Sequence, residues 1–317
     1  MSYPPNESHT RIRSRIPRAS GRRVRGVRAA VLAVAAASAL VLAGCTAHTA
    51  HTADATRAAE HTAASSPSVT AVSPAQASVV GQKVTITGTD LQNVKAVAFG
   101  SASVRVLSAS ADKVVAQAPA AANYQPATVA LKLIGKTGKT IATKPGALEY
   151  TAAGGVAAQL EYALAHWQNY NTAEYGDLNP DGGDCANFVS QTLIARGWTM
   201  NDDWYNHEAG DDWSPAWGYV PAMDDYFAEN AASLGLEQLS FSQADRAKVA
   251  LGDIAVFDWD GDGSPDHVEV VDRITKVNGQ YKIELASHND DYAYRDLDET
   301  ITTQHPGATG HFWHLTR

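Results

Sequence analysis

The sequence predicts two folded domains: an all-β sandwich over residues 68–152, and a domain of helices followed by strands over residues 154–317. Three observations predict this organisation. Short stretches of alternating apolar and polar residues fill the first domain, helical spacing opens the second, and strand-like runs complete it. A chain of 317 residues, 44% of them hydrophobic, can bury cores of this size without disulfides.

The head of the chain has the pattern of an export signal. Residues 1–44 carry eight arginines against one acid, Glu7, although the whole chain has a net charge of −9. An apolar run over 29–44 follows the arginines, and it is shorter than the about 20 residues that a membrane-spanning helix needs. A basic region before a short apolar run is typical of a secretory signal. We therefore predict a signal peptide over 1–44 and an extracytoplasmic, acidic remainder, whose charge argues against nucleic-acid binding.

The end of this signal resembles a bacterial lipobox. The tetrapeptide Leu42-Ala43-Gly44-Cys45 places a cysteine directly after small residues, and the resemblance implies that Cys45 is lipidated and anchors the chain to a membrane. The alternative is an ordinary signal peptide that happens to contain a cysteine. Residues 45–67 are rich in Ala, Thr, Ser and His and lack large apolar side chains, which predicts a flexible tether. Only two cysteines are present in the chain, so a disulfide scaffold is excluded.

The first domain reads as a series of short strands separated by Gly, Pro, Asn and Asp. The expected strands are 69–74, 84–88, 94–99, 104–107, 114–118, 129–134 and 147–150. Their near-regular spacing predicts a small β-sandwich. The segments "VTITGT" and "VAFG" resemble the opening of an IPT/TIG immunoglobulin-like domain. Because residues 68–152 contain neither Cys nor His, we expect a spacer or binding module rather than a catalytic domain.

The second domain opens with helical periodicity and a candidate nucleophile. Helical spacing covers residues 156–170 and again 186–196, where Gly197 provides a stop and Asp184 an N-cap. Cys185 then lies in the first turn of the second helix, where backbone N–H groups and the macrodipole favour a thiolate. A thiolate is a nucleophile for acyl transfer. The alternative is a buried free cysteine that packs as a small apolar residue.

A candidate base follows in the strand-like part of the domain, whose runs are 252–257, 267–272 and 280–286. His267 opens the second run beside a polar turn, which suits an accessible general base. The third run leads into His288 and Asn289, and either could orient the imidazole of His267 as the third member of a catalytic triad. The residues alone leave that choice open.

Three separated blocks carry a resemblance to a known family. "GGDCANFVSQTLIARGW", "GDIAVFDWDGDGSPDHVEVV" and "SHNDDY" resemble the bacterial putative amidase domain family of papain-like cysteine hydrolases, related to NlpC-type and cysteine/histidine-dependent amidohydrolases. The resemblance implies an α+β papain-like fold, with Cys185 as nucleophile, His267 as base and His288, ahead of Asn289, as third residue. It implies hydrolysis of an amide through a thioester, without a cofactor. Compartment and family analogy together suggest cell-wall peptide as the substrate.

The turn before His267 matches a calcium-loop pattern. "DWDGDGSPDHVE" over residues 258–269 fits D-x-D-x-D-G-x5-E. The ligands would be Asp258, Asp260, Asp262, the carbonyl of Ser264, Asp266 and Glu269. The flanking segments are strands rather than helices, and His267 and Glu269 fall in the second strand, which favours an acidic turn that connects two strands. A structural Ca²⁺ is the other interpretation, and it predicts that calcium stabilises the chain.

A competing class of function is a non-catalytic surface-binding protein that acts through the immunoglobulin-like domain. The order of Cys185, His267 and a polar third residue favours the enzyme. Acyl transfer to an amine rather than to water would use the same residues, and the sequence does not separate it from hydrolysis.

Overall fold

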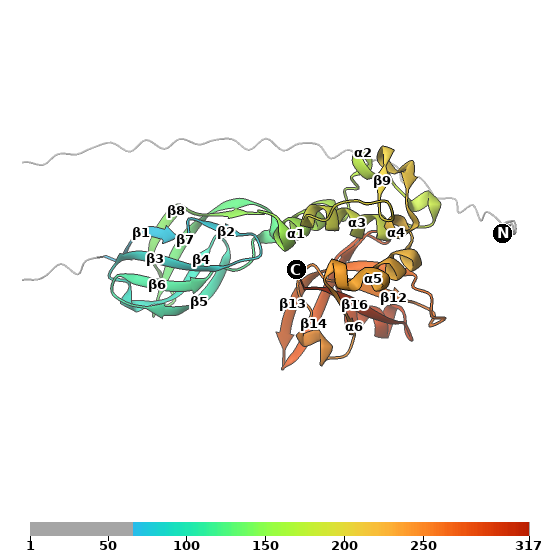
Figure 1. Cartoon of the computed structure of the whole chain (residues 1–317). Helices are drawn as coiled ribbons and strands as arrows, with labels where there is room; N and C mark the ends of the chain where they lie inside the picture. Colours follow the sequence, from blue (N-terminus) through green and yellow to red (C-terminus); the bar gives the residue numbers. More distant parts are fainter. Residues whose placement is uncertain (1–65, 317) are drawn as a thin grey trace, which may run out of the picture. The chain divides into compact units, whose positions relative to one another are not determined.

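The computed structural model describes residues 66–316 (Figure 1). The predicted signal peptide, Cys45 and nearly all of the predicted tether lie outside these residues. Among the helices of the described part of the chain, none is both long and apolar enough to cross a membrane.

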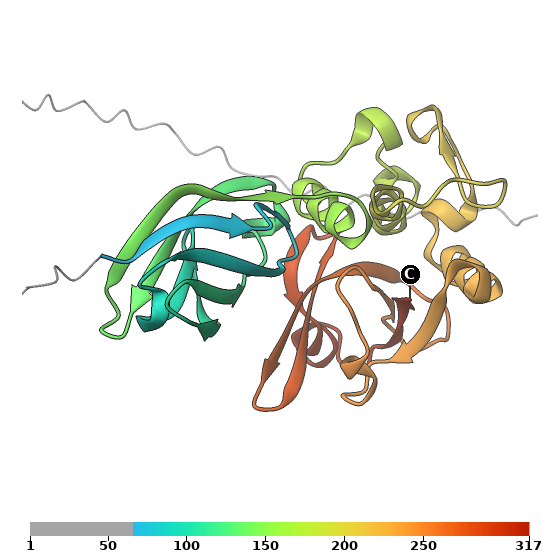
Figure 2. The same ribbon diagram turned by 60° about the vertical axis from the view of Figure 1, so that its left-hand side comes forward.

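The first domain contains eight strands and no α-helix within its described residues. They are β1 (Ser68–Ser73), β2 (Gln76–Ser78), β3 (Lys83–Thr89), β4 (Val94–Phe99), β5 (Ala102–Ala109), β6 (Lys113–Gln117), β7 (Ala127–Gly135) and β8 (Thr140–Thr151). The strand order is β1-β3-β6-β5-β4-β7-β8-β2, so β5 pairs with both β6 and β4. Figure 2 shows these strands, coloured blue to green, in a second view. Alternation explains the strands: in β3, Val84 and Ile86 are buried while Lys83 and Thr89 are exposed. The expected β-rich first domain is confirmed.

The second domain begins with helices. Their bounds are α1 (Gly155–His166), α2 (Thr172–Tyr175), α3 (Cys185–Arg196), α4 (Pro215–Gly218), α5 (Val220–Leu234) and α6 (Leu297–Glu299). The helix α3 ends where the sequence predicts, because Gly197 adopts a left-handed conformation with φ 115°. Two short strands, β9 (Asn206–His207) and β10 (Asp212–Trp213), pair between α3 and α4.

An antiparallel sheet of six strands completes this domain. Its strands are β11 (Leu236–Ser240), β12 (Ile254–Asp258), β13 (His267–Val277), β14 (Gln280–Ser287), β15 (Tyr292–Asp296) and β16 (Thr309–Leu315). The order is β11-β16-β12-β13-β14-β15, which places β13 at an interior position. Helix α3 packs on β13 and β14. The second domain therefore combines helices and a sheet.

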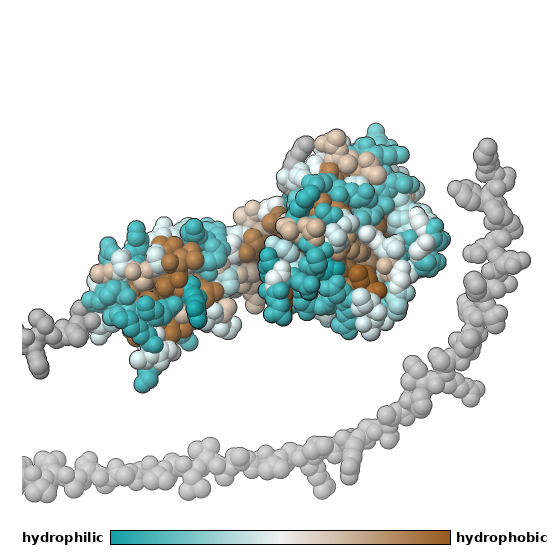
Figure 3. Space-filling model, turned by 90° about the horizontal axis from the view of Figure 1, so that it is seen from below, coloured by the Kyte–Doolittle hydropathy of each residue, from teal (hydrophilic) through white to brown (hydrophobic). Residues whose placement is uncertain are grey.

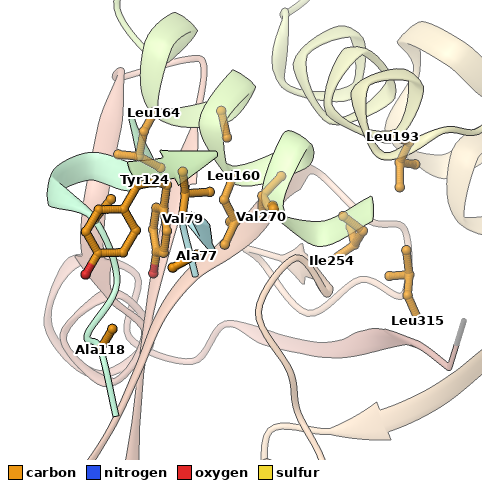
Figure 4. Packing of buried hydrophobic residues seen from close by; sticks show 14 of the residues in the cluster. Ala77, Val79, Ala118, Tyr124, Leu160, Leu164, Leu193, Ile254, Val270 and Leu315 are labelled. Atoms are coloured by element: carbon orange, nitrogen blue, oxygen red, sulfur yellow. The ribbon is translucent and has the colours of Figure 1, made fainter. Parts of the chain in front are cut away.

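Buried side chains form a cluster that includes residues of both domains. Figure 4 shows Val79 and Tyr124 of the first domain near Leu160 and Leu164 of α1. Hydrogen bonds accompany this packing: the Tyr124 hydroxyl donates to the Asp272 carbonyl, and Nε2 of Gln125 donates to the Glu161 carbonyl at 3.1 Å. Buried apolar contacts and two hydrogen bonds therefore connect residues of the two domains.

Large hydrophobic side chains on the surface of the described residues are Leu107, Tyr219 and Val277. Figure 3 shows one face, on which hydrophilic residues are interspersed with hydrophobic ones. Of these three exposed side chains, Tyr219 belongs to the neighbourhood of the candidate nucleophile, as described next.

Candidate active site

Cys185 is the first residue of α3, and it follows a loop with two glycines in backbone conformations that favour glycine. Gly182 and Gly183 have φ of 125° and 147°, which side chains rarely adopt. A Cβ on Gly183 would lie 2.9 Å from Nδ2 of Asn289. Cys185 is buried, with 5% of its surface exposed, and it is a free thiol. The thiol therefore lies at the wall of a cleft and is largely shielded from solvent.

That cleft has a volume of about 280 Å³ and is lined by the loop around Cys185, by Trp213 and residues 218–221, and by the turn of residues 264–266. Asp181, Gly182 and Gly183 form part of its wall on the side of the nucleophile loop. Trp213 and Tyr219 contribute aromatic rings, and Asp266 contributes a carboxylate from the turn before β13. A cleft that reaches a thiol is the geometry that covalent attack on a bound acyl group needs.

The structure brings His267 to Cys185. His267 opens β13 and is buried, with 6% of its surface exposed. Burial alone would lower the pKa of its imidazole, but the charge of Cys185, a hydrogen bond with that side chain, and Glu269 raise the pKa to about 10. The imidazolium is therefore the favoured form at neutral pH beside the sulfur.

Two side chains contact Nε2 of His267. Nε2 lies 3.2 Å from Oγ of Ser287 and 3.2 Å from Oε1 of Glu269. The Ser287 hydroxyl gives its own proton to the His288 carbonyl at 2.9 Å, so it accepts the Nε2 proton. Sequence reasoning missed both partners of the imidazole. The available signal was the two-residue spacing of His267 and Glu269, which places both on one side of a strand.

Glu269 therefore lies at the imidazole and not in the acidic turn. It is fully buried, and Oε1 also accepts a hydrogen bond from Nη1 of Arg295 at 3.1 Å. Its other oxygen, Oε2, is buried without a hydrogen-bond partner among the described residues. The expectation that Glu269 is a calcium ligand is contradicted by this position, because the strand continues from His267 and carries Glu269 into the protein interior.

His288 and Asn289 lie on the other side of the nucleophile, at the loop before α3. The Nδ1 atom of His288 lies 2.5 Å from Oδ2 of Asp184, and Nε2 donates to the His166 carbonyl at 3.0 Å. Asn289 accepts a hydrogen bond from the Asp184 backbone N–H at 2.7 Å. Both ring nitrogens of His288 are thus engaged away from His267, so neither residue occupies the expected place of an imidazole-orienting group.

The acidic turn brings three of the predicted calcium ligands together. Carboxylate oxygens of Asp258, Asp260 and Asp262 lie within 4.8 Å of one another. Asp258 also accepts hydrogen bonds from the N–H groups of Gly261 and Gly263, at 2.8 and 2.9 Å. Clustered carboxylates of this kind fit a hard cation such as Ca²⁺.

The remaining predicted calcium ligands are placed differently within the same turn. The N–H of Ser264 donates to Asp262 at 2.8 Å. Asp266 accepts from the N–H of Trp259 at 2.7 Å and also lines the cleft of Cys185. The turn is therefore attached at its far end to the candidate active site.

Comparisons with known proteins assign families to both domains. The model of the family described as "Putative amidase domain" matches residues 155–313, and that of the IPT/TIG domain matches residues 67–150. An uncharacterized protein of Bacillus subtilis (strain 168), YhbB, is 26% identical over 175 residues, which are 53% of this chain and 51% of that protein. The chain spans about half the length of this curated relative.

Solved structures with similarity cover smaller shares of the chain. A gamma-CGTase from the alkalophilic Bacillus clarkii is 17% identical, with a TM-score of 0.23 over 27% of this chain and 12% of that chain. An auxiliary nutrient binding protein from Bacteroides ovatus ATCC 8483 is 16% identical, with a TM-score of 0.22 over 28% of this chain and 22% of that chain. At these TM-scores neither likeness bears on function.

Proposed function

The chain belongs to the family described as the putative amidase domain, through residues 155–313, and from this membership we propose that it is a cysteine-dependent amidohydrolase. The observation that carries the proposal is the pairing of Cys185 with His267 at a cleft. A thiol beside an imidazole that favours its charged form is the arrangement that thiolate catalysis uses. A helix that bears the nucleophile against an antiparallel sheet that bears the base also agrees with a papain-like domain.

The proposed reaction begins with the thiolate of Cys185. It attacks the carbonyl carbon of an amide in the cleft, and a C–S bond forms as the carbonyl π electrons move to oxygen. N–H groups at the start of α3 donate to this oxyanion. The C–N bond then breaks, and the imidazolium of His267 gives its proton to the leaving amine. The products of this half-reaction are a thioester on Cys185 and a free amine.

Water completes the cycle. His267, now neutral, accepts a proton from a water molecule that attacks the thioester carbonyl, and the thiolate leaves as the carboxylic acid is released. Glu269 holds the proton-bearing Nε2 of His267, as does Ser287. This leaves Nδ1 to exchange protons at the sulfur and at the leaving amine. We assign Glu269 and Ser287, in place of His288 and Asn289, as the residues that orient the base.

The proposed setting is the cell envelope, with Cys45 as a lipid anchor and amide bonds of cell-wall peptide as the substrate. This part of the proposal rests on the Arg-rich head, the lipobox-like tetrapeptide and the family, and not on the geometry of the cleft. The immunoglobulin-like domain is proposed as a spacer between the anchor and the hydrolase.

The test is release of free amines from purified cell wall by residues 46–317, beside the Cys185→Ala variant. Release by the parent alone supports a Cys185-dependent wall hydrolase, and mass spectrometry of the fragments identifies the bond. The alkylation rate of Cys185 with iodoacetamide is measured in parallel. A Cys185 that reacts no faster than a free thiol, together with no release, contradicts the proposal and favours a binding protein.

A further inference from the structure

Asp184 occupies the N-cap position of α3, yet its carboxylate does not cap the helix. An aspartate at this position usually adopts an extended backbone and accepts hydrogen bonds from N–H groups of the first turn. Asp296 does so at α6, where it accepts from the N–H groups of Asp298 and Glu299. Asp184 instead has φ −106° and ψ 0°, and its side chain makes no bond to the α3 N–H groups.

The carboxylate of Asp184 is held by groups outside the helix backbone. Oδ1 accepts from the Leu178 N–H and from Nδ2 of Asn187, each at 2.8 Å. Oδ2 lies 2.5 Å from Nδ1 of His288. Asp184 and His288 are both fully buried, so no solvent competes for this contact.

His288 is itself fixed in place on all sides. Its ring stacks on Tyr170, with centroids 3.6 Å apart and an interplanar angle of 11°, and on Phe188 at 4.2 Å. Its Nε2 donates to the His166 carbonyl at 3.0 Å, which directs Nδ1 toward Asp184. These contacts hold the His288 ring in one orientation, and its Nδ1 holds Oδ2 of Asp184.

The consequence concerns the N–H groups of Cys185 and Ala186. The first N–H groups of a helix have no acceptor within the helix, and a capping carboxylate would take them. A carboxylate in that place would also put a negative charge where the oxyanion forms. We propose that His288 is a positioning residue that keeps the Asp184 carboxylate away from the start of α3, so that these N–H groups remain free for the oxyanion. This inference rests on the proposed function.

Two reactions of Cys185 separate this role from general support of the fold. Acylation by 4-nitrophenyl acetate passes through an oxyanion, whereas alkylation by iodoacetamide does not. Both rates are measured on the full chain and taken from the plateau of their pH profiles, so that a change in the thiolate fraction is not counted. For His288→Ala we expect acylation to fall by about 100-fold, the loss typical of a missing oxyanion donor, and alkylation to change by less than about 3-fold.

A second substitution gives the decisive result. In the double variant His288→Ala/Asp184→Ala no carboxylate is left to cap α3, so we expect acylation to recover by about 10-fold or more over the single variant. A purely structural role predicts the reverse, because the double variant has lost more buried contacts and melts at a lower temperature. If His288→Ala does not fold, His288→Gln keeps more of the bulk and enters the same comparison.

The matched control is His314→Ala. Its Nδ1 lies 2.8 Å from Oδ2 of Asp253, so it removes a similar His–Asp contact from the same domain, and His314 does not line the cleft. It should leave the ratio of acylation to alkylation unchanged. Equal losses in both reactions for His288→Ala, or a double variant no faster than the single one, would overturn the inference. A parent chain that is neither acylated nor rapidly alkylated at Cys185 overturns the proposed function, and this inference with it.

Discussion

Replacing Glu269 by glutamine removes the charge that lies 3.2 Å from Nε2 of His267. Burial lowers the pKa of His267, whereas Cys185 and Glu269 raise it to about 10. A single opposite charge within about 4–6 Å shifts a pKa by about 1–3 units. We therefore expect His267 in Glu269→Gln to titrate between roughly pH 7 and pH 9, which would be read from its side-chain NMR signal in the parent and the variant.

The same substitution changes stability with a defined sign. Because the pKa of His267 is raised, its charged form stabilises the folded chain fully below the ordinary value of 6.5, and this contribution is lost as pH rises through about 10. The variant should lose it at lower pH. Arg295 also loses its carboxylate partner but keeps Gln304, at 3.0 and 2.7 Å, so we expect a cost of about 3 kcal/mol, or roughly 6–12 °C in Tm.

Glu284→Gln is the control for this experiment. Glu284 lies on the neighbouring strand β14, pairs with Arg273 at 2.9 Å and does not contact His267. Its substitution should therefore leave the pKa of His267 unchanged. An unchanged titration of His267 in Glu269→Gln would refute the reasoning, because it would mean that Glu269 does not stabilise the imidazolium. A loss of folding is recognised separately by circular dichroism.

Three further outcomes are expected. Millimolar Ca²⁺ should raise the Tm by roughly 5 °C over EDTA, and Asp262→Asn should abolish the difference; equal melting in both buffers would show that the turn binds no calcium. Leu160→Ala should cost about 2–5 kcal/mol in chemical denaturation because Leu160 is fully buried on α1, whereas Val277→Ala, at an exposed position, should cost little. Gly183→Ala should slow acylation of Cys185 because its Cβ would displace Asn289, and an unaltered rate would show that this loop tolerates a side chain.

Alternation and helix periodicity predicted the strands of the first domain except β2, and in the second domain α1, α3, β12, β13 and β14, because each pattern reports burial on one face. Helix α5 and the strands β11, β15 and β16 were not predicted. The strands β3 and β6 and the helix α3 lie where those patterns place them. The three-residue strand β2 was missed because it is too short for alternation to be visible. β8 was predicted only over its last residues, because Pro145 and Gly146 interrupt the pattern although pairing with β7 continues past them with a register shift.

The site was predicted where local chemistry decides and missed where tertiary packing decides. A glycine-rich loop before a helix is a local feature, and it placed Cys185 correctly at the start of α3. The first six residues of β13 are buried on both faces of the strand. The sequence there lacks the alternation that would show which face points toward the nucleophile. From the sequence, Glu269 could therefore be either the last ligand of a calcium motif or a partner of His267. The folded structure shows that the Glu269 carboxylate contacts His267 and Arg295.

Two buried carboxylates flank Cys185, and their partners separate their roles. Glu269 contacts His267, which exchanges protons with the sulfur, so its removal should alter titration first. Asp184 contacts His288, which exchanges no proton with the sulfur, so loss of His288 should alter acyl transfer first. If both variants moved both readouts equally, the two carboxylates would act only through the stability of the domain. If the Glu269 variant changes mainly the His267 titration and the His288 variant changes mainly acyl transfer, then separate parts of the site support proton transfer and oxyanion stabilisation.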